Sequence, residues 1–297
     1  MKDESTKPED QAIAWFLLIA LSLIWGSSFI LIKKSLIGLT ASMVGALRVI
    51  FASLFLLPFF YKNLKGLTKS ELKHLFFVGL TGSFIPAILF ALAQTKINSS
   101  LAGLLNSLTP TMVLVVGAIF FSQQIKRSSL IGVILGLIGS FILIAGFSIR
   151  QFTSINFYAF FVLIATLMYG INLNIIKHRL LNVKAPQITI VSVCMVMPFA
   201  AIYLLLFTPF LAIEYSTEVV WSMLSVSVLG VVGTSLALFL FNKMVKISST
   251  IFSSSVTYLI PIIAIFWGLM DGETILLHHV FGSITILAGI ILINRRS

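Results

Sequence analysis

Long apolar runs separated by short polar breaks fill the chain from residue 12 to residue 293. The runs show no strict alternation of apolar and polar positions, and they are close to the about 20 residues that a helix needs to cross a bilayer. A backbone in lipid has to satisfy its own hydrogen bonds, so such segments are helices. The pattern predicts ten transmembrane helices, at 12–32, 41–61, 74–94, 99–121, 129–147, 155–176, 187–210, 219–242, 249–270 and 275–293.

The second half of this pattern repeats the first. Residues 25–33 read WGSSFILIK and residues 169–177 read YGINLNIIK. Further pairs stay in register at separations of 144–151 positions: Gly79-x-x-Gly82 with Gly230-x-x-Gly233, Lys96-Ile97-Asn98-Ser99 with Lys246-Ile247-Ser248-Ser249, and Pro110 with Pro261. Self-similarity of this kind indicates an internal repeat. We expect one five-helix repeat at 12–147 and a second at 155–293, between short tails at 1–11 and 294–297.

A repeat with an odd number of helices enters the membrane from opposite faces in its two copies. The two halves are therefore expected to be inverted, as in many secondary transporters, in which the substrate site lies at the repeat interface near the bilayer midplane. The fold class predicted is an all-α integral membrane protein with ten transmembrane helices.

Composition agrees with a membrane protein, and the ten predicted spans leave no room for a soluble domain. Apolar residues make up 59% of the chain and charged residues 10%, with a mean hydropathy of +1.10, whereas soluble proteins carry roughly 25% charged residues. The net charge of +11 does not predict nucleic-acid binding, because the basic residues sit singly or in pairs between apolar runs. Cys194 has no partner for a disulfide, and His278 and His279 are too few for a metal site, so we expect no cofactor or metal.

The distribution of basic residues predicts the orientation. The tails and the even-numbered connections hold fifteen Lys and Arg residues, against four in the odd-numbered connections. This asymmetry predicts that both termini lie in the cytoplasm. The protein is then a multi-pass protein of the inner (plasma) membrane. The first apolar run lacks a small-x-small cleavage pattern, so we expect it to be retained. Besides the bilayer and a small-molecule substrate, the organisation is compatible with a homodimer.

The motifs and the order of the predicted helices resemble the EamA type of the drug/metabolite transporter superfamily. The resemblance covers nearly the whole chain: W-G-x-x-F at 25–29, Arg48 early in the second helix, fourth and ninth helices rich in small residues with a central proline, and Gly272-Glu273. It implies export or exchange of metabolites through a central cavity lined by both halves. The chain departs from the family where Ser122-Gln123 replaces the Gly-Glu of the first half.

Pro110 and Pro261 fall near the middle of the fourth and ninth spans. A proline inside a helix cannot donate to the carbonyl four residues earlier, so the carbonyls of Asn106 and Thr257 are expected to be free. Two readings remain open at this point. The prolines are either hinges beside the substrate, or structural kinks solvated by neighbouring hydroxyls.

Pairs of aromatic and polar residues mark the candidate cavity. Trp25 and Ser28 share one helix face, as do their counterparts Tyr169 and Asn172. An aromatic ring beside a hydrogen-bonding group suits a ligand with apolar and polar parts, although contacts between helices are an alternative. The substrate-binding residues predicted are Trp25, Ser28, Arg48, Asn106, Tyr169, Asn172, Thr257 and Tyr258, with Pro110 and Pro261 as hinges.

Arg48 is the charged residue that the pattern places inside a span. A buried arginine is costly in a membrane unless it is paired or hydrated, which favours a functional role. The alternative is snorkelling of the side chain toward the outer interface.

Asp271 and Glu273 lie in the predicted turn before the last helix. No Asp or Glu lies inside any predicted span, whereas proton-driven carriers commonly relay protons through carboxylates in helix interiors. We therefore expect facilitated or exchange transport, or proton coupling through Glu273.

The function predicted is a secondary carrier that works by alternating access on small metabolites. One deep arginine and several amides favour an amino-acid-like or other small amphipathic solute. Two other classes stay open: a channel, for which no ring of charge is visible, and a membrane-embedded lipid-modifying enzyme, for which no HExxH, GxSxG or acidic cluster is present. We do not expect an enzyme.

Overall fold

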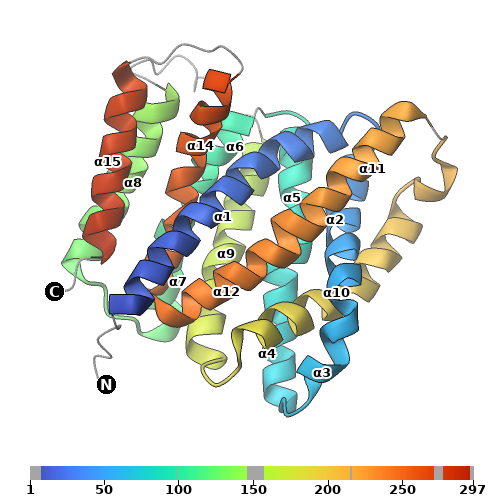
Figure 1. Ribbon diagram of the computed structural model, residues 1–297, viewed down its shortest axis with the longest axis horizontal. Coiled ribbons are helices and arrows are strands. Elements are labelled where there is room, and N and C mark those ends of the chain that lie inside the picture. Colours follow the sequence, from blue (N-terminus) through green and yellow to red (C-terminus); the bar gives the residue numbers. More distant parts are fainter. Residues whose placement is uncertain (1–7, 98, 146–156, 215, 271–276, 295–297) are drawn as a thin grey trace.

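The computed structural model describes residues 8–97, 99–145, 157–214, 216–270 and 277–294, which are helical with short connections (Figure 1). The α-helices are α1 Pro8–Ser35, α2 Ala41–Leu56, α3 Phe60–Leu64, α4 Lys69–Gly79, α5 Ile85–Gln94, α6 Ser99–Asn106, α7 Thr109–Phe121, α8 Arg127–Ala145, α9 Ala159–Arg179, α10 Ala185–Phe207, α11 Thr217–Gly230, α12 Ala237–Ile247, α13 Thr250–Ser254, α14 Val256–Met270 and α15 Leu277–Asn294. No strand occurs in these residues.

Six continuous helical stretches are long and apolar enough to cross a membrane: Glu9–Ser35, Ala41–Leu64, Lys69–Gln94, Ala159–Arg179, Ala185–Phe207 and Thr217–Ile247. Four shorter apolar helices cover the remaining predicted spans, at Thr109–Phe121, Arg127–Ile142, Thr250–Ile263 and Val280–Ile293. The predicted class, a helical bundle suited to a bilayer, is therefore confirmed. Asp271, Gly272 and Glu273 lie outside the described residues.

Two long helices contain a π-helical turn at equivalent repeat positions. Leu80–Phe84 joins α4 to α5, and Val231–Leu236 joins α11 to α12. Each turn contains the second glycine of a Gly-x-x-Gly pair, Gly82 or Gly233. In a π-turn the regular ladder of backbone hydrogen bonds is interrupted, and such turns occur frequently at functional sites.

The fourth and ninth predicted helices are broken, and the breaks differ from the expectation. Pro110 stands in the first turn of α7, where its missing N–H costs nothing, and the break precedes it. Pro261 lies inside α14. The carbonyl oxygen of Asn106, expected to be free, accepts a 2.7 Å hydrogen bond from the hydroxyl of Thr109. A local hydroxyl thus satisfies one of the backbone carbonyls that the break leaves without a helical partner.

The bundle has a closely packed pair of helices at one end, α8 and α15 (Figure 1). A β-carbon built on Gly132 would lie 2.6 Å from the carbonyl oxygen of Gly289, and one on Gly139 would lie 2.9 Å from the oxygen of Gly282. Small residues let helix backbones approach in this way. These glycines are therefore packing residues.

The ends of the helices divide into two sides. α1 begins and α15 ends on the same side of the bundle, where α9 and α12 also end (Figure 1). We call this the basic side, because its helix ends carry Lys62, Lys69, Arg127, Lys177, Arg179, Lys243 and Lys246.

Candidate functional site

A cavity lies between the two halves of the described chain, with walls from α1, α2, α5, α6, α7, α9, α12, α13, α14 and the two π-turns. About 100 Å³ of it is open to the centres of water-sized molecules. A single water needs roughly 10–15 Å³ on this scale, so the cavity can hold a small solute. Its lining includes Trp25, Ser28, Phe29, Arg48, Gly82, Ser83, Phe90, Asn106, Thr109, Tyr169, Asn172, Gly233, Thr234, Phe241, Ser254, Thr257 and Ile260.

Seven of the eight residues proposed from sequence line this cavity: Trp25, Ser28, Arg48, Asn106, Tyr169, Asn172 and Thr257. Tyr258 does not. Its side chain is fully buried, its hydroxyl donates to the carbonyl oxygen of Val133 at 3.1 Å, and its ring packs over Gly136. Neighbouring residues on a helix point about 100° apart, so Tyr258 faces α8 while Thr257 faces the cavity. Pro110 and Pro261 are buried close by without lining it.

Arg48 turns toward the second half rather than toward a membrane interface. Its Nε donates to the hydroxyl oxygen of Thr234 at 2.7 Å, and its Nη2 donates to the carbonyl oxygen of Gly233 at 3.3 Å. These contacts argue against the snorkelling alternative. Among the described residues that line the cavity, Arg48 alone carries a charge, and none is acidic. Its guanidinium therefore brings a positive charge without a carboxylate partner from the cavity wall.

Trp25 contacts the same π-turn from α1. Its Nε1 donates to the carbonyl oxygen of Gly233 at 3.0 Å, and its ring meets Phe241 edge-on with centroids 5.2 Å apart. Ser28, one turn further on, donates its hydroxyl proton to the carbonyl oxygen of Ile24. The N–H of the indole is thus bonded to the π-turn, and the aromatic surface of the ring faces the cavity.

Asn172 contacts the first π-turn in a similar way. Its Nδ2 donates to the carbonyl oxygen of Val78 at 2.8 Å and lies 3.3 Å from the hydroxyl of Thr81. A β-carbon on Gly82 would come within 2.4 Å of that nitrogen, so glycine is required for the approach. Each π-turn is therefore held by a polar side chain from the other half of the chain.

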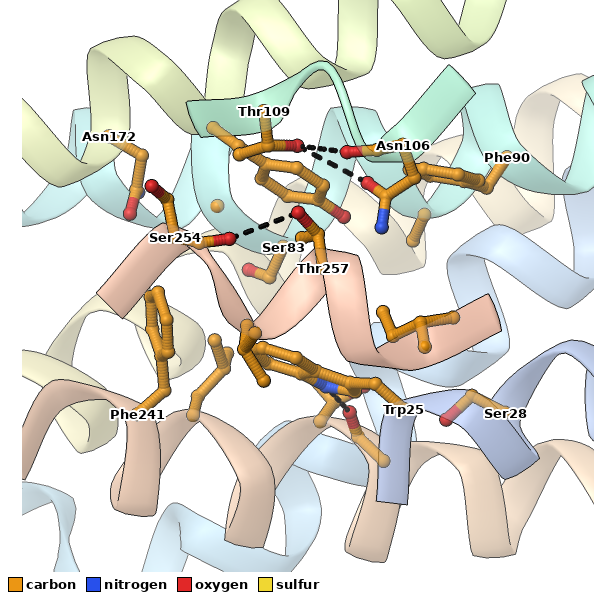
Figure 2. A pocket seen from close by; sticks show the side chains of 18 of the residues that line it. Trp25, Ser28, Ser83, Phe90, Asn106, Thr109, Asn172, Phe241, Ser254 and Thr257 are labelled. Atoms are coloured by element: carbon orange, nitrogen blue, oxygen red, sulfur yellow. Dashed lines mark hydrogen bonds between the residues drawn. The ribbon is translucent and has the colours of Figure 1, made fainter. Parts of the chain in front are cut away.

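The remaining wall is aromatic with two polar groups. Phe90 and Tyr169 stack with centroids 6.1 Å apart, and Phe29 meets Phe90 edge-on. The Oδ1 of Asn106 lies 3.4 Å from the hydroxyl of Thr109, while its amide nitrogen points into the cavity (Figure 2).

Sequence reasoning missed part of this lining, including Phe90, Phe241, Thr234 and Ser254. The repeated Gly-x-x-Gly pairs marked the region of Thr234 but not its contact with Arg48. Phe90 and Phe241 are aromatic residues among many in apolar helices, and nothing in their sequence context distinguishes them.

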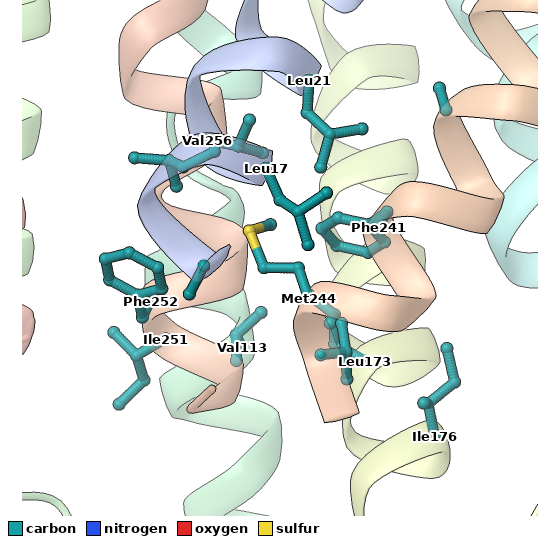
Figure 3. Packing of buried hydrophobic residues seen from close by; sticks show 14 of the residues in the cluster. Leu17, Leu21, Val113, Leu173, Ile176, Phe241, Met244, Ile251, Phe252 and Val256 are labelled. Atoms are coloured by element: carbon teal, nitrogen blue, oxygen red, sulfur yellow. The ribbon is translucent and has the colours of Figure 1, made fainter. Parts of the chain in front are cut away.

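A hydrophobic cluster separates the cavity from the basic side. Figure 3 shows the packing of part of this cluster. It includes Leu17 and Leu21 of α1, Ile176 of α9, Met244 of α12 and Phe252 of α13. In each helix these residues lie between the cavity residues and the helix end on the basic side. The cluster therefore closes this route to the cavity.

An apolar helical bundle with a partly polar cavity between its halves has the architecture of a solute transporter. The chain belongs to the EamA-like transporter family, whose model matches it twice, over residues 12–145 and 156–295. Members of this family are transporters rather than enzymes.

Two curated relatives agree with this class. An uncharacterized transporter of Archaeoglobus fulgidus is 27% identical over 125 residues, 42% of this chain and 45% of the relative. A WAT1-related protein of Arabidopsis thaliana is 27% identical over 138 residues, 43% of this chain and 39% of the relative. The matches thus span less than half of each relative. A solved crystal structure shares the fold over 94% of this chain and 95% of its own, with a TM-score of 0.70 and 15% identity.

Proposed function

We propose that the protein is a secondary carrier that moves a small amphipathic solute by alternating access around this cavity. The observation that carries the proposal is the pairing of lining residues between the two repeats. Equivalent positions meet in one cavity: Trp25 with Tyr169, Ser28 with Asn172, Gly82 with Gly233, Phe90 with Phe241, and Asn106 with Thr257. A site shared by two inverted repeats can be exposed to either side by rocking one against the other.

The proposed topology has ten spans in the plasma membrane, with both ends of the chain in the cytoplasm. It is supported by the common side on which α1 begins and α15 ends (Figure 1), and by the basic residues at the helix ends there. An excess of Lys and Arg marks cytoplasmic connections, so the basic side is assigned to the cytoplasm. The hydrophobic cluster then closes the cavity toward the cytoplasm.

The substrate class inferred from sequence, amino-acid-like or other small amphipathic solutes, suits a cavity with aromatic walls and several polar groups. We propose export or exchange as the direction of use. None of the described cavity residues is a carboxylate, which favours exchange or facilitated movement over a proton relay within the cavity.

Counterflow in proteoliposomes tests the carrier proposal. Vesicles with purified protein are loaded with a mixture of unlabelled amino acids and small organic acids, and entry of each labelled solute is measured. A carrier gives saturable entry that is accelerated by the same solute inside, with protein-free vesicles as the control. Entry that rises linearly with concentration and ignores the internal solute is channel behaviour and contradicts the proposal.

A further inference from the structure

We propose that the preferred solute is a small organic anion that carries no ammonium group, such as a monocarboxylate with an apolar or aromatic body. This proposal rests on the proposed carrier function and narrows it away from amino acids. It follows from the balance of charge and of hydrogen-bonding groups in the cavity.

The cavity offers a cation and donors to one end of a solute. Arg48 uses Nε and Nη2 on Thr234 and Gly233, which leaves further guanidinium N–H groups, since this side chain donates in several directions. The side-chain nitrogen of Asn106 points into the same space (Figure 2). Hydrogen bonds from ionised donors to a carboxylate are shorter and stronger than neutral ones.

The same cavity has no ionic partner for an ammonium group. Its described lining contains no Asp or Glu. The carbonyl oxygen of Gly233, which could accept from an ammonium, already accepts from Trp25 and Arg48. An amino acid would also bring its positive charge near that of Arg48 in a region of low dielectric, where like charges repel strongly. An anion with a neutral body avoids this repulsion.

The rest of the wall suits such a body. Phe90 and Tyr169 present stacked rings, Trp25 and Phe241 form a second aromatic pair, and Ile260 contributes an aliphatic side chain. Aromatic and aliphatic surfaces bind apolar groups by removing them from water.

Four compounds with one common body provide the test: 3-phenylpropionate, its amide, phenylalanine and phenethylammonium. Binding to the purified protein in detergent is measured by calorimetry and by thermal stabilisation. We expect 3-phenylpropionate to bind at least about tenfold more tightly than the amide and phenylalanine, a factor that one charged hydrogen bond can supply. Arg48→Gln should reduce the ratio of acid to amide affinity toward one, and Arg48→Lys should keep part of it.

The ratio within each variant remains informative if a substitution also lowers stability. Equal or tighter binding of phenylalanine overturns the proposal, as does binding of none of the four. Saturable counterflow of phenylalanine but not of the acid leaves the carrier function standing and removes the anion preference. Non-saturable flux removes the carrier function, while the binding ratios still decide whether the cavity selects anions.

A separate observation concerns two lysines at the basic side. The Nζ of Lys177, near the end of α9, donates to the carbonyl oxygens of Val245 and Ser248 at the end of α12, at 3.2 and 2.8 Å. The Nζ of Lys246, in the last turn of α12, donates to the carbonyl oxygens of Leu180 and Leu181 just after α9. Each lysine thus caps the other helix, where unpaired carbonyls and the helix dipole favour a cation.

The repeat gives these lysines counterparts on the opposite side. Lys33 corresponds to Lys177 and Lys96 to Lys246. Both counterparts are exposed, and neither side chain makes a hydrogen bond within the described part of the chain. Lys33 instead lines a groove together with Leu36 and Thr95, the positions that match Leu180 and Val245. The groove therefore lies where a second reciprocal pair would close.

We infer that the two lysine pairs are alternating latches. In this structure Lys177 and Lys246 hold the cytoplasmic ends of α9 and α12 together, below the hydrophobic cluster, while the Lys33 and Lys96 pair is open. When the carrier turns over, inverted symmetry lets Lys33 and Lys96 cap the outer ends of α5 and α1, and the cytoplasmic pair separates. Latches of this kind shift a two-state equilibrium.

Cysteine labelling without substrate tests the latches. On a Cys194→Ser background, Leu21→Cys reports opening toward the cytoplasm and Thr40→Cys reports the outer groove. We expect Lys177→Gln with Lys246→Gln to raise labelling of Leu21→Cys about tenfold or more and to lower labelling of Thr40→Cys, because charged hydrogen bonds that favour one state are lost. Lys33→Gln with Lys96→Gln should shift labelling the other way.

Matched controls separate a latch from a general loss of charge. Lys243→Gln on α12 and Lys34→Gln on α1 remove exposed lysines next to the latch residues, and both should leave labelling unchanged. Lys246→Arg should keep most of the closed population if glutamine disturbs folding. Unchanged labelling in the latch variants, or equal shifts in the controls, overturns the inference. This equilibrium readout does not require transport, so failure of counterflow is recognised separately.

Discussion

The indole nitrogen of Trp25 donates a 3.0 Å hydrogen bond to the carbonyl oxygen of Gly233, across an interval of 208 positions. The acceptor lies in the π-turn Val231–Leu236, where the regular ladder of backbone bonds is interrupted and carbonyls become available to side chains. Arg48 shares this acceptor at 3.3 Å. One carbonyl oxygen thus joins α1, α2 and the α11–α12 stretch beside the cavity.

Trp25→Phe should lower stability modestly and affect transport more. The substitution keeps an aromatic ring against Phe241 and removes the donor, and a single hydrogen bond between membrane helices averages about 0.6 kcal/mol. We expect a loss of that order in a reversible unfolding titration in detergent. Trp25→Ala should cost more, because ring contacts are lost as well. A stability equal to wild type in Trp25→Phe would show that Arg48 alone satisfies the carbonyl.

Gly82→Ala should impair transport with little change in stability. The added methyl group would lie 2.4 Å from the Nδ2 of Asn172, so this side chain has to leave its contact with the carbonyl of Val78. The lost bond, about 1 kcal/mol, is offset by the roughly 0.5–1 kcal/mol that alanine gains over glycine inside a helix. Transport should fall by about tenfold in kcat/KM, the equivalent of one polar contact in the cavity.

Gly103→Ala is the matched control for this substitution. Gly103 lies in α6, and nothing lies within 4 Å of a β-carbon built on it. Counterflow and thermal unfolding are measured on both variants. Equal transport by Gly82→Ala and Gly103→Ala would exclude a positioning role for the contact between Gly82 and Asn172.

How much of the molecule the sequence predicts depends on the kind of information each feature needs. Hydropathy located the helices, because the free energy of contact with lipid depends on the residue type and can be read for each residue separately. The repeat located the cavity, because Trp25, Tyr169, Asn106 and Thr257 occupy paired positions. The π-turns escaped prediction, since they are defined by backbone hydrogen bonds, and the Gly-x-x-Gly pairs did not reveal them.

Tyr258 shows a second limit. Residues around it are apolar or small on every face, so hydrophobic periodicity gives no rotation of the helix, and the break at Ser255 resets the phase that a continuous helix would have. The lysine pairs show a third. The repeat aligns Lys96 with Lys246, but whether a pair is closed depends on the conformation and not on the sequence.

Tyr258→Phe should leave substrate binding unchanged, although Tyr258 was a candidate from sequence. The hydroxyl bonds the carbonyl oxygen of Val133 at 3.1 Å, so its removal should cost roughly 0.6 kcal/mol of stability and leave KM as in wild type. Asn106→Ala, which removes a cavity amide, is the positive control and should raise KM. A KM for Tyr258→Phe that rises as far as that of Asn106→Ala would place the tyrosine at the substrate.

Pro261→Ala and Pro110→Ala should have different effects, although the two prolines are equivalent in the repeat. Pro110 lies in the first turn of α7, where no helical bond is lost, so its replacement should change stability and transport little. Pro261 lies inside α14, where a proline costs about 3 kcal/mol or more through a missing bond and a clash with the carbonyl four residues earlier. That carbonyl belongs to Thr257, a cavity residue.

Replacing Pro261 by alanine allows this bond to form and removes the clash between the proline ring and the carbonyl group of Thr257. We therefore expect Pro261→Ala to raise the Tm of the purified protein while slowing counterflow, because a regular α14 resists the bending that exposes the cavity to the other side. Pro261→Gly serves as the control: it also restores an N–H group but keeps the segment flexible, so it should retain faster transport than the alanine variant. A hinge role for Pro261 is wrong if Pro261→Ala transports at the wild-type rate, whatever its Tm.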